Sequence, residues 1–175
     1  GKLAEAEALY RRALRGSEKA LGADHPDTLP IVDNLASNLH AQGKLAEAEV
    51  LVRRTLKGSE KVFGADHPYT LTSVGNLAAN LEEQGRVADA EALKRRALEG
   101  SEKALGVDHP DTLTSVSHLA INLEHQGKLG DAETLYQRTL KGREKALGAD
   151  HRSTLISVNN LAGNLKDQGK LADAE

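Results

Sequence analysis

The sequence predicts an all-α fold, an α-solenoid of antiparallel helix pairs. The first observation is internal repetition, because glycine recurs every 42 residues, at Gly1, Gly43, Gly85, Gly127 and Gly169. The second is that each repeat holds two stretches of helical periodicity, separated by a turn that contains Gly and, in three of the four copies, Pro. The third is the short connection between repeats, which requires the next helix to run antiparallel. Units repeated at such a period stack into a solenoid.

The repeat also predicts the domain organisation. Four copies follow one another without insertion, over residues 1–42, 43–84, 85–126 and 127–168, and residues 169–175 begin a fifth copy. Twenty of the 42 positions hold the same residue in all four copies. We therefore expect a single array over residues 1–175. Because the chain begins and ends within a repeat, we expect it to be a fragment of a longer array.

The composition restricts the classes of function. The 175 residues include no Cys, Met or Trp, three Tyr and one Phe. The apolar residues are nearly all Leu, Ala and Val, which suits close helix packing and argues against a large aromatic-lined pocket. Charged residues of both signs make up 28% of the chain, with a net charge of −3. Non-specific nucleic-acid binding needs a strong field of one sign, so we expect no nucleic-acid partner.

Targeting and catalytic signals are also missing from the sequence. The chain has no run of about 18 apolar residues that would span a membrane, and its first residues lack the apolar core of a signal peptide. The expected location is cytoplasmic, with no membrane partner. There is no Gly-rich phosphate loop, no GxSxG and no nucleophile beside a base. We therefore expect no enzyme activity and no cofactor.

A long helix is predicted to open each repeat, over residues 2–21 in the first copy. Small and apolar side chains recur along it at helical spacing, at Leu3, Ala6, Leu9 or Tyr10, Ala13, Ser17 and Leu21. Glu and Arg four residues apart add a few tenths of a kcal/mol each, at Glu7–Arg11, Glu49–Arg53 and Glu91–Arg95. The helix should end at Gly22, which adopts the left-handed C′ conformation at little cost.

The turn that follows reads Ala23-Asp24-His25-Pro26. Proline is favoured in a first helical turn, and either Asp24 or His25 could be the N-cap of the second helix. That helix should run to about Ala41. The recurring Asp-His pairs could instead be metal ligands, but they lie one repeat apart, about 10 Å or more. A structural turn is the better interpretation.

One residue does not fit the long helix. Glycine inside a helix costs roughly 1 kcal/mol relative to Ala, yet it recurs in every copy, at Gly16, Gly58, Gly100 and Gly142. A kink, or the close approach of a neighbouring helix, would explain this glycine. We favour that interpretation over a flexible break with a functional purpose.

The stretch NLASNLHAQGKLAEAEVLVRRTL resembles a tetratricopeptide repeat (TPR). That family has Leu and a small residue in its first helix, which Leu35 and Ala36 match. It also has Gly at the turn and Ala in the second helix, which Gly43 and Ala48 match. The sequence departs from the common 34-residue form, because the Pro that ends the second helix is missing and the helix continues to Gly64. The resemblance covers the whole chain and implies a right-handed superhelix with a concave ligand-binding side.

The longer unit, with its EKxLGxDHPxTL linker, resembles the 42-residue repeat of kinesin-light-chain type. The pattern AL-x-G-S-EK-x-LG-x-DHP-x-TL-x-SV-x-NLA is similar to arrays on fungal and bacterial NOD-like receptors (STAND NTPases), where the arrays are thought to act as ligand sensors. This resemblance implies a scaffold that binds a protein or peptide as the sensor of an innate-immunity receptor. The chain itself contains no nucleotide-binding domain.

The second helix of each repeat has two different faces. At 100° per residue, five residues that are identical in every copy fall on one side, which should face the core: Thr28, Val32, Leu35, Ala36 and Leu39. The opposite side varies at five positions, and we name it the variable stripe. In the first copy these positions are Pro30, Asp33, Ser37, His40 and Ala41. We interpret it as a recognition groove rather than neutral drift. The exposed face of the long helix varies less cleanly, at Tyr10/Val52/Lys94/Tyr136 and Arg15/Lys57/Glu99/Lys141.

The variable stripe is bordered by an Asn ladder, formed by Asn34, Asn76 and Asn160, with His118 at the same position of the third copy. These side chains could pair with the backbone of an extended peptide, as the matching residues do in repeats of kinesin-light-chain type, or could bond between helices. The candidate ligand-binding residues of stripe and ladder are Pro30, Asp33, Asn34, Ser37, His40 and Ala41; Thr72, Gly75, Asn76, Ala79, Glu82 and Glu83; Thr114, Ser117, His118, Ile121, Glu124 and His125; and Ile156, Asn159, Asn160, Gly163, Lys166 and Asp167. The invariant Asn38, Asn80, Asn122 and Asn164 should be structural.

The chemistry of these residues narrows the partner. Acidic residues outnumber Lys166 along the stripe, so we expect a neutral or mildly basic protein or peptide. The Lys and Asn clamp with which some TPR domains hold chaperone carboxylates is absent. His118 and His125 could hold a metal with Glu124, but this is the weaker interpretation and we expect no metal.

Two other functions compete with ligand binding. The first is end-to-end self-association, since the terminal repeats expose faces that a second copy could cover. The second is an engineered consensus array, suggested by the near-identical copies.

Overall fold

A computed structural model describes residues 1–169. It contains helices α1 (Lys2–Leu21), α2 (Leu29–Ala41), α3 (Leu45–Phe63), α4 (Pro68–Glu83), α5 (Val87–Leu105), α6 (Pro110–His125), α7 (Leu129–Leu147) and α8 (Arg152–Asp167). Within the described residues there is no strand, which confirms the all-α prediction. All but the first residue of the predicted fifth copy lies outside this range.

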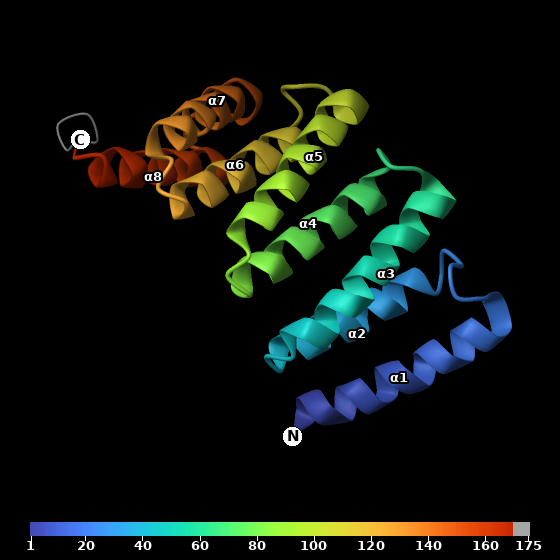
Figure 1. The fold of residues 1–175 in the computed structure, drawn as a ribbon. Coiled ribbons are helices and arrows are strands. Elements are labelled where there is room, and N and C mark those ends of the chain that lie inside the picture. Colours follow the sequence, from blue (N-terminus) through green and yellow to red (C-terminus); the bar gives the residue numbers. More distant parts are fainter. Residues whose placement is uncertain (170–175) are drawn as a thin grey trace. The chain divides into compact units, whose positions relative to one another are not determined.

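The chain forms two compact units, residues 1–93 and 94–175, and the boundary falls within α5. In the first unit, α1 packs on α2, α2 on α3, and α3 on α4, each antiparallel to the next (Figure 1). In the second unit, α6 packs on α7, and α7 on α8. The core of the first unit includes Leu14, Val32, Leu35, Leu39 and Ala48. That of the second includes Leu119, Ala120, Leu123, Ala132 and Tyr136.

The predicted core face of the short helices is confirmed, since Thr28, Val32, Leu35, Ala36 and Leu39 are at most 3% exposed. The prediction for the long helix is wrong in part, because Leu3, Leu9 and Leu21 are exposed. The side chains that α3 buries show which positions face inward: Ala48, Val52, Thr55, Leu56 and Ser59. Of the two alternatives Leu9 and Tyr10, the inward one is therefore Tyr10.

The turn before each short helix is closed by histidine. In α4 the Nδ1 atom of His67 accepts a hydrogen bond from the backbone N–H of Tyr69 at 3.2 Å, and His109 and His151 cap α6 and α8 in the same way. His25 makes the same bond to Asp27, although α2 begins only at Leu29. A proline at position 30 has no N–H to complete an earlier turn, which explains the later start.

The neighbouring aspartate has a different role. Lys61 donates to Asp24 at 2.8 Å, and Lys145 donates to Asp108 at 2.9 Å. The ammonium group of Lys61 lowers the pKa of the Asp24 carboxyl. Asp24 therefore ties its turn to the long helix of the following repeat. The N-cap prediction is wrong for α2, whose N-cap is Thr28, whereas in α4, α6 and α8 the histidine of the Asp-His pair is the N-cap.

The mid-helix glycines mark close approaches between repeats. A Cβ atom added at Gly58 would lie 2.7 Å from Cδ2 of the buried Leu29, and one at Gly142 would lie 2.7 Å from Cδ2 of Leu113. No real Cβ atom tolerates such a distance without movement of its neighbour. Gly16, in the first helix, has no atom within 4 Å of that position. The close-approach interpretation is confirmed for the second and fourth copies.

A conserved set of polar side chains within each copy joins the two helices. Gln42 donates to Asn38 Oδ1 at 2.8 Å and to Glu7 Oε2 at 2.9 Å. Lys44 also donates to Glu7, and these bonds lower the pKa of the Glu7 carboxyl to about 2. The Gln–Asn bond recurs at residues 84 and 80, 126 and 122, and 168 and 164. The four invariant Asn residues therefore have the structural role expected of them.

Candidate functional site

The variable stripe lies mainly on the surface of the short helices. In α2, Pro30, Asn34, Ser37 and Ala41 are exposed, and Asp33 and His40 are half-buried. In α4, Thr72, Asn76, Ala79 and Glu83 are exposed, and Gly75 and Glu82 are half-buried. The first unit therefore presents its part of the predicted stripe to solvent.

The second unit presents most of its stripe in the same way. In α6, His118 and His125 are exposed, and Thr114, Ile121 and Glu124 are half-buried. In α8, Ile156, Asn159, Gly163, Lys166 and Asp167 are exposed and Asn160 is half-buried. Ser117 differs, because it is only 6% exposed. Its short side chain does not reach the surface at a position where Asp33 does, so Ser117 is removed from the candidate contact residues.

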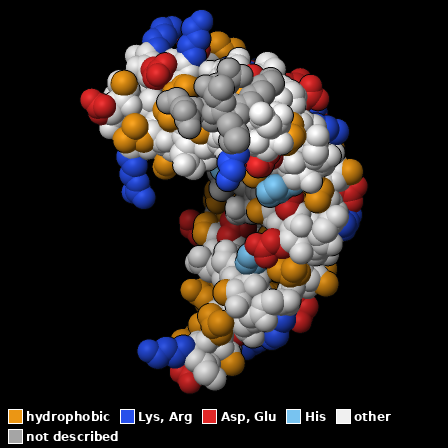
Figure 2. Space-filling view, turned by 90° about the vertical axis from the view of Figure 1, so that its left-hand side faces the viewer, with side chains coloured by type: hydrophobic (Ala, Val, Ile, Leu, Met, Phe, Trp, Pro, Cys, Tyr) orange, Lys and Arg blue, Asp and Glu red, His pale blue; other side chains and the backbone are white. Residues whose placement is uncertain are grey.

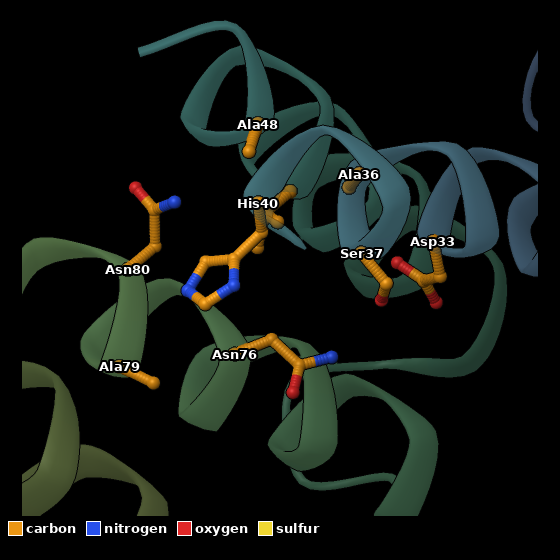
Figure 3. Close-up of a pocket in the computed structure, with 9 residues that line it drawn as sticks. Asp33, Ala36, Ser37, His40, Ala48, Asn76, Ala79 and Asn80 are labelled. Carbon is orange, nitrogen blue, oxygen red and sulfur yellow. The ribbon is translucent and has the colours of Figure 1, made fainter. Parts of the chain in front are cut away.

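A hollow of about 200 Å³ lies between α2 and α4. Asp33, Ser37 and His40 of α2 and Asn76 and Ala79 of α4 line its walls (Figure 3). Ala36, Ala48, Val52 and Asn80 complete the lining, so that apolar side chains of α3 form the floor. Five residues of the predicted stripe and ladder therefore meet in one cavity.

Asp33 carries the charge of this hollow. Tyr69 donates its hydroxyl hydrogen to Asp33 Oδ2 at 2.6 Å. Burial raises the pKa of the Asp33 carboxyl, while Tyr69 and the nearby Thr55 offset part of that rise. The contact with Thr55 is loose, since both Asp33 Oδ1 and the Thr55 hydroxyl are buried without a hydrogen bond of normal geometry. Burial and the Asp33 carboxylate together raise the pKa of Tyr69.

A second polar contact closes the other end of the hollow. The Nε2 atom of His40 lies 3.0 Å from Oε2 of Glu83. Ser37 and Asn76 make no side-chain hydrogen bond within residues 1–169, so their polar groups are available to a ligand. Asn80 is already engaged, because it donates to the Leu45 carbonyl at 3.2 Å and accepts from Gln84.

The equivalent place in the second unit is filled by tyrosine. Tyr136, on α7, occupies the position of Val52 and is 1% exposed. Its hydroxyl donates to Glu124 Oε2 at 2.7 Å, and Asn164 donates to Glu124 Oε1 at 3.4 Å. The carboxylate of Glu124 is thus used within the fold. A Glu124 substitution would disturb structure as well as any ligand contact.

This comparison corrects the placement of one variable position. The position of Tyr10, Val52, Lys94 and Tyr136 was assigned to the exposed face of the long helix, but Val52 and Tyr136 are buried. Val52 lies at the floor of the hollow, beneath the stripe. The sequence left Leu9 and Tyr10 as alternatives for the core face, and only the second alternative would have placed Val52 in the core. The residue at the position of Leu9 is the same in every copy, whereas the residue at the position of Tyr10 differs. Variation at a core-facing position indicates a cavity whose depth differs between repeats.

The Asn ladder is placed where a ligand could reach it. Asn34 and Asn76 are exposed, and neither forms a side-chain hydrogen bond to another helix in the described part of the chain. The alternative of inter-helix bonding therefore finds no support at these two residues. His118, in the same register, lies on the exposed face of α6, and its carbonyl accepts from Lys94 at 3.1 Å.

Metal ligation finds no support in the described residues, which contain no group of three or more His, Asp or Glu side chains arranged around a common point. The Asp-His pairs are used in turns and inter-repeat ion pairs, and Glu124 is bonded to Tyr136 and Asn164.

Charged side chains of both signs are scattered over the face drawn in Figure 2.

The profile of the tetratricopeptide repeat matches the chain over residues 1–61, 30–103, 72–145 and 111–175. The chain belongs to the tetratricopeptide repeat family. TPR arrays are typically protein-interaction scaffolds without catalytic activity. No curated protein matches the sequence. In residues 1–169, no helix of this TPR protein has the length and apolar character needed to cross a membrane.

Solved structures support the 42-residue class of TPR. Two crystal structures of nearly identical TPR-like repeats from Podosopora anserina, assigned to kinesin light chain, match at 28% identity, cover 99% of this chain and 82% of theirs, and have TM-scores of 0.88 and 0.87. The crystal structure of BtubC (BKLC) from P. vanneervenii matches at 22% identity, with coverage of 99% and 69% and a TM-score of 0.86, and shows the same fold.

Proposed function

We propose that this TPR array binds an extended peptide or protein segment along a concave groove formed by the variable stripe and the Asn ladder. The observation that carries the proposal is the hollow between α2 and α4, because Asp33, Ser37, His40, Asn76 and Ala79 all line it. The positions of Asp33, Ser37, His40 and Ala79 differ between copies and line one cavity, while the buried residues Val32, Leu35 and Leu39 of the short helix are identical in every copy. Such an arrangement allows ligand specificity to change without loss of the fold.

The available amides support an extended ligand. Asn side chains offer a donor and an acceptor each, and Asn34 and Asn76 are exposed one repeat apart on adjacent short helices. A peptide backbone in extended conformation could use both. We further propose that the array is the ligand-sensing part of a larger NOD-like receptor, on the strength of the sequence pattern described above. A nucleotide-binding domain in the same polypeptide would support this; a full-length protein without one would contradict it.

The peptide groove can be tested with a displayed library of random peptides selected on the 175-residue chain. The best peptide is labelled, and its binding is measured by fluorescence anisotropy. Replacing Glu83 with Lys should weaken binding at least tenfold, because it reverses a charge beside the hollow. Replacing Asn76 with Ala should weaken it about three- to tenfold, as loss of one or two hydrogen bonds does.

The matched control is Glu99→Lys, the same charge reversal at an exposed position of α5 outside the stripe. It should change binding less than twofold. The circular dichroism of all variants should stay that of the parent. Equal losses for Glu83→Lys and Glu99→Lys, or unfolding of Glu83→Lys, would contradict the assignment of the groove.

End-to-end self-association is a second candidate, favoured by one observation. Leu155 is 53% exposed on α8, whereas its counterparts Leu29 and Leu113 are buried against a glycine of the next long helix. Gly16, at the equivalent position of α1, has no atom within 4 Å of an added Cβ atom, so a second copy could repeat the Leu–Gly contact. Light scattering tests this, since mass should rise with concentration and Leu155→Asp should abolish the rise. A constant monomer mass would exclude it.

A further inference from the structure

We propose that the hollow between α2 and α4 is a pocket for one basic side chain, Lys or Arg, of the bound segment, with Asp33 as its counter-ion. This inference rests on the proposed function and specifies its ligand. The floor of the hollow is apolar, made by Ala36, Ala48 and Val52, and its wall carries the Asp33 carboxylate. Lys and Arg combine an apolar stem with a charged end, so both parts of such a side chain find a matching surface.

The nearest carboxylates make the surroundings of the hollow mainly acidic. Neither α2 nor α4 contains a Lys or Arg residue. Three Arg or Lys side chains of the neighbouring α3 are engaged elsewhere, Arg53 with Glu49, Arg54 with Glu18 and Lys61 with Asp24. Glu83 lies at the rim, where it contacts His40 at 3.0 Å. An incoming cation therefore meets acidic groups, and none of the residues that line the hollow is Lys or Arg.

Asp33 is held ready for this role. The bond from Tyr69 fixes the carboxylate on one side, so its orientation does not depend on the ligand. Partial burial strengthens its interaction with a cation relative to a fully solvated carboxylate. Ser37 and Asn76 add free polar groups that can bond the ligand's backbone or the N–H groups of its charged end (Figure 3).

The second unit shows why this pocket is specific to one place. There the position of Asp33 is Ser117, which is buried, and the position of Val52 is Tyr136, whose ring fills the floor. Glu124, at the position of His40, is bonded to that tyrosine. The equivalent place between α6 and α8 therefore has no carboxylate at the Asp33 position, and a buried tyrosine replaces Val52. The basic residue of the ligand should have a fixed register on α2 and α4.

The test uses the 175-residue chain labelled with ¹⁵N and four small probes, the N-acetyl methylamides of Lys, Arg, norleucine and Glu. Amide signals are followed during titration at neutral pH. The Lys or Arg probe should shift signals of Asp33, Ser37 and Asn76 and bind at least tenfold more tightly than norleucine, which has a similar stem without the charge. The stronger of the two cations identifies the preferred side chain.

Two variants separate charge from shape. Asp33→Asn should reduce binding of the cationic probe at least tenfold, because the amide can still accept from Tyr69 but carries no charge. Val52→Tyr should also abolish binding by filling the floor, as Tyr136 does in the second unit. The control Asp111→Asn removes one exposed carboxylate at the start of α6 and should leave binding unchanged.

Equal binding of norleucine and the cations, no shift of the three signals, or unchanged binding to Asp33→Asn would each overturn the proposal. Failure here is distinguishable from failure of the proposed function. Peptides selected from the library could still bind with sensitivity to Glu83→Lys while showing no enrichment of Lys or Arg. That result would retain the groove and reject the basic pocket.

Discussion

Replacing Tyr136 with Val is expected to lower the free energy of unfolding by about 3 kcal/mol, the cost of removing most of a buried aromatic ring. Tyr136 belongs to the core cluster of the second unit and is 1% exposed. Its hydroxyl also satisfies Glu124 at 2.7 Å. The substitution should open a hollow like that between α2 and α4, since Val is the residue found at the same position in the second copy.

Urea denaturation followed by circular dichroism measures this change. The control is Tyr136→Phe, which keeps the ring and loses only the hydroxyl, at a cost of about 1 kcal/mol. Similar costs for the Phe and Val variants would mean that the hydrogen bond, rather than the filling of the core, accounts for the contribution of Tyr136 to stability. A cost below about 1 kcal/mol for Val would show that neighbouring side chains collapse into the space.

Replacing Gly142 with Val is expected to cost about 3 kcal/mol, the upper part of the range for over-packing a core. A Cβ atom at this position would lie 2.7 Å and 2.8 Å from the two Cδ atoms of Leu113 and 3.3 Å from its Cγ. Leu113 is 1% exposed, so it is packed among other side chains. Helix α7 would have to move away from α6, which separates the two helices along their shared contact.

Gly16→Val is the matched control, because it changes the same position of the repeat where no atom lies within 4 Å. Valine has a helix propensity a few tenths of a kcal/mol better than glycine, so this variant should unfold at an equal or slightly higher urea concentration. A loss at Gly16 equal to that at Gly142 would show that the glycine is needed for helix geometry rather than for close approach.

Much of the fold could be predicted from the repeat. The identity of Val32, Leu35 and Leu39 in every copy indicated the core face of the short helix, and their burial confirms it. Periodicity was less informative in the long helix. Leu9 and Tyr10 are both compatible with a buried stripe, and hydrophobicity favours the leucine. The helix instead turns position 10 inward, toward the space between two short helices, which sequence spacing alone could not reveal.

The contacts between repeats were the least predictable feature. Gly58 was recognisable as an exception, but its partner Leu29 lies 29 residues earlier, so only the structure could identify the contact. Arg143 gives a similar example, because it stands at the position of the buried Ser59 and Ser101 and is itself only 8% exposed. Its guanidinium donates to Ser157 at 2.9 Å and to Thr114 at 3.3 Å. A charged residue at that position would otherwise be expected at the surface.

The candidate site was predictable in its position but not in its depth. Residue identity indicated that Asp33, Ser37 and His40 face away from the core, and the structure places them in the walls of one hollow. Whether a wall encloses a cavity depends on the floor, where Val52 leaves space and Tyr136 does not. That difference concerns side-chain volume in a neighbouring helix, which a periodic pattern does not record.

The contacts between successive repeats have an evolutionary consequence. The Leu29–Gly58 and Leu113–Gly142 approaches use the same positions, as do the Asp24–Lys61 and Asp108–Lys145 ion pairs. Every residue of these contacts is identical in all four copies. Recombination that deletes or duplicates one 42-residue unit would therefore recreate the same junction each time. The gene could change the number and order of its recognition surfaces in a single step, without a compensating mutation elsewhere.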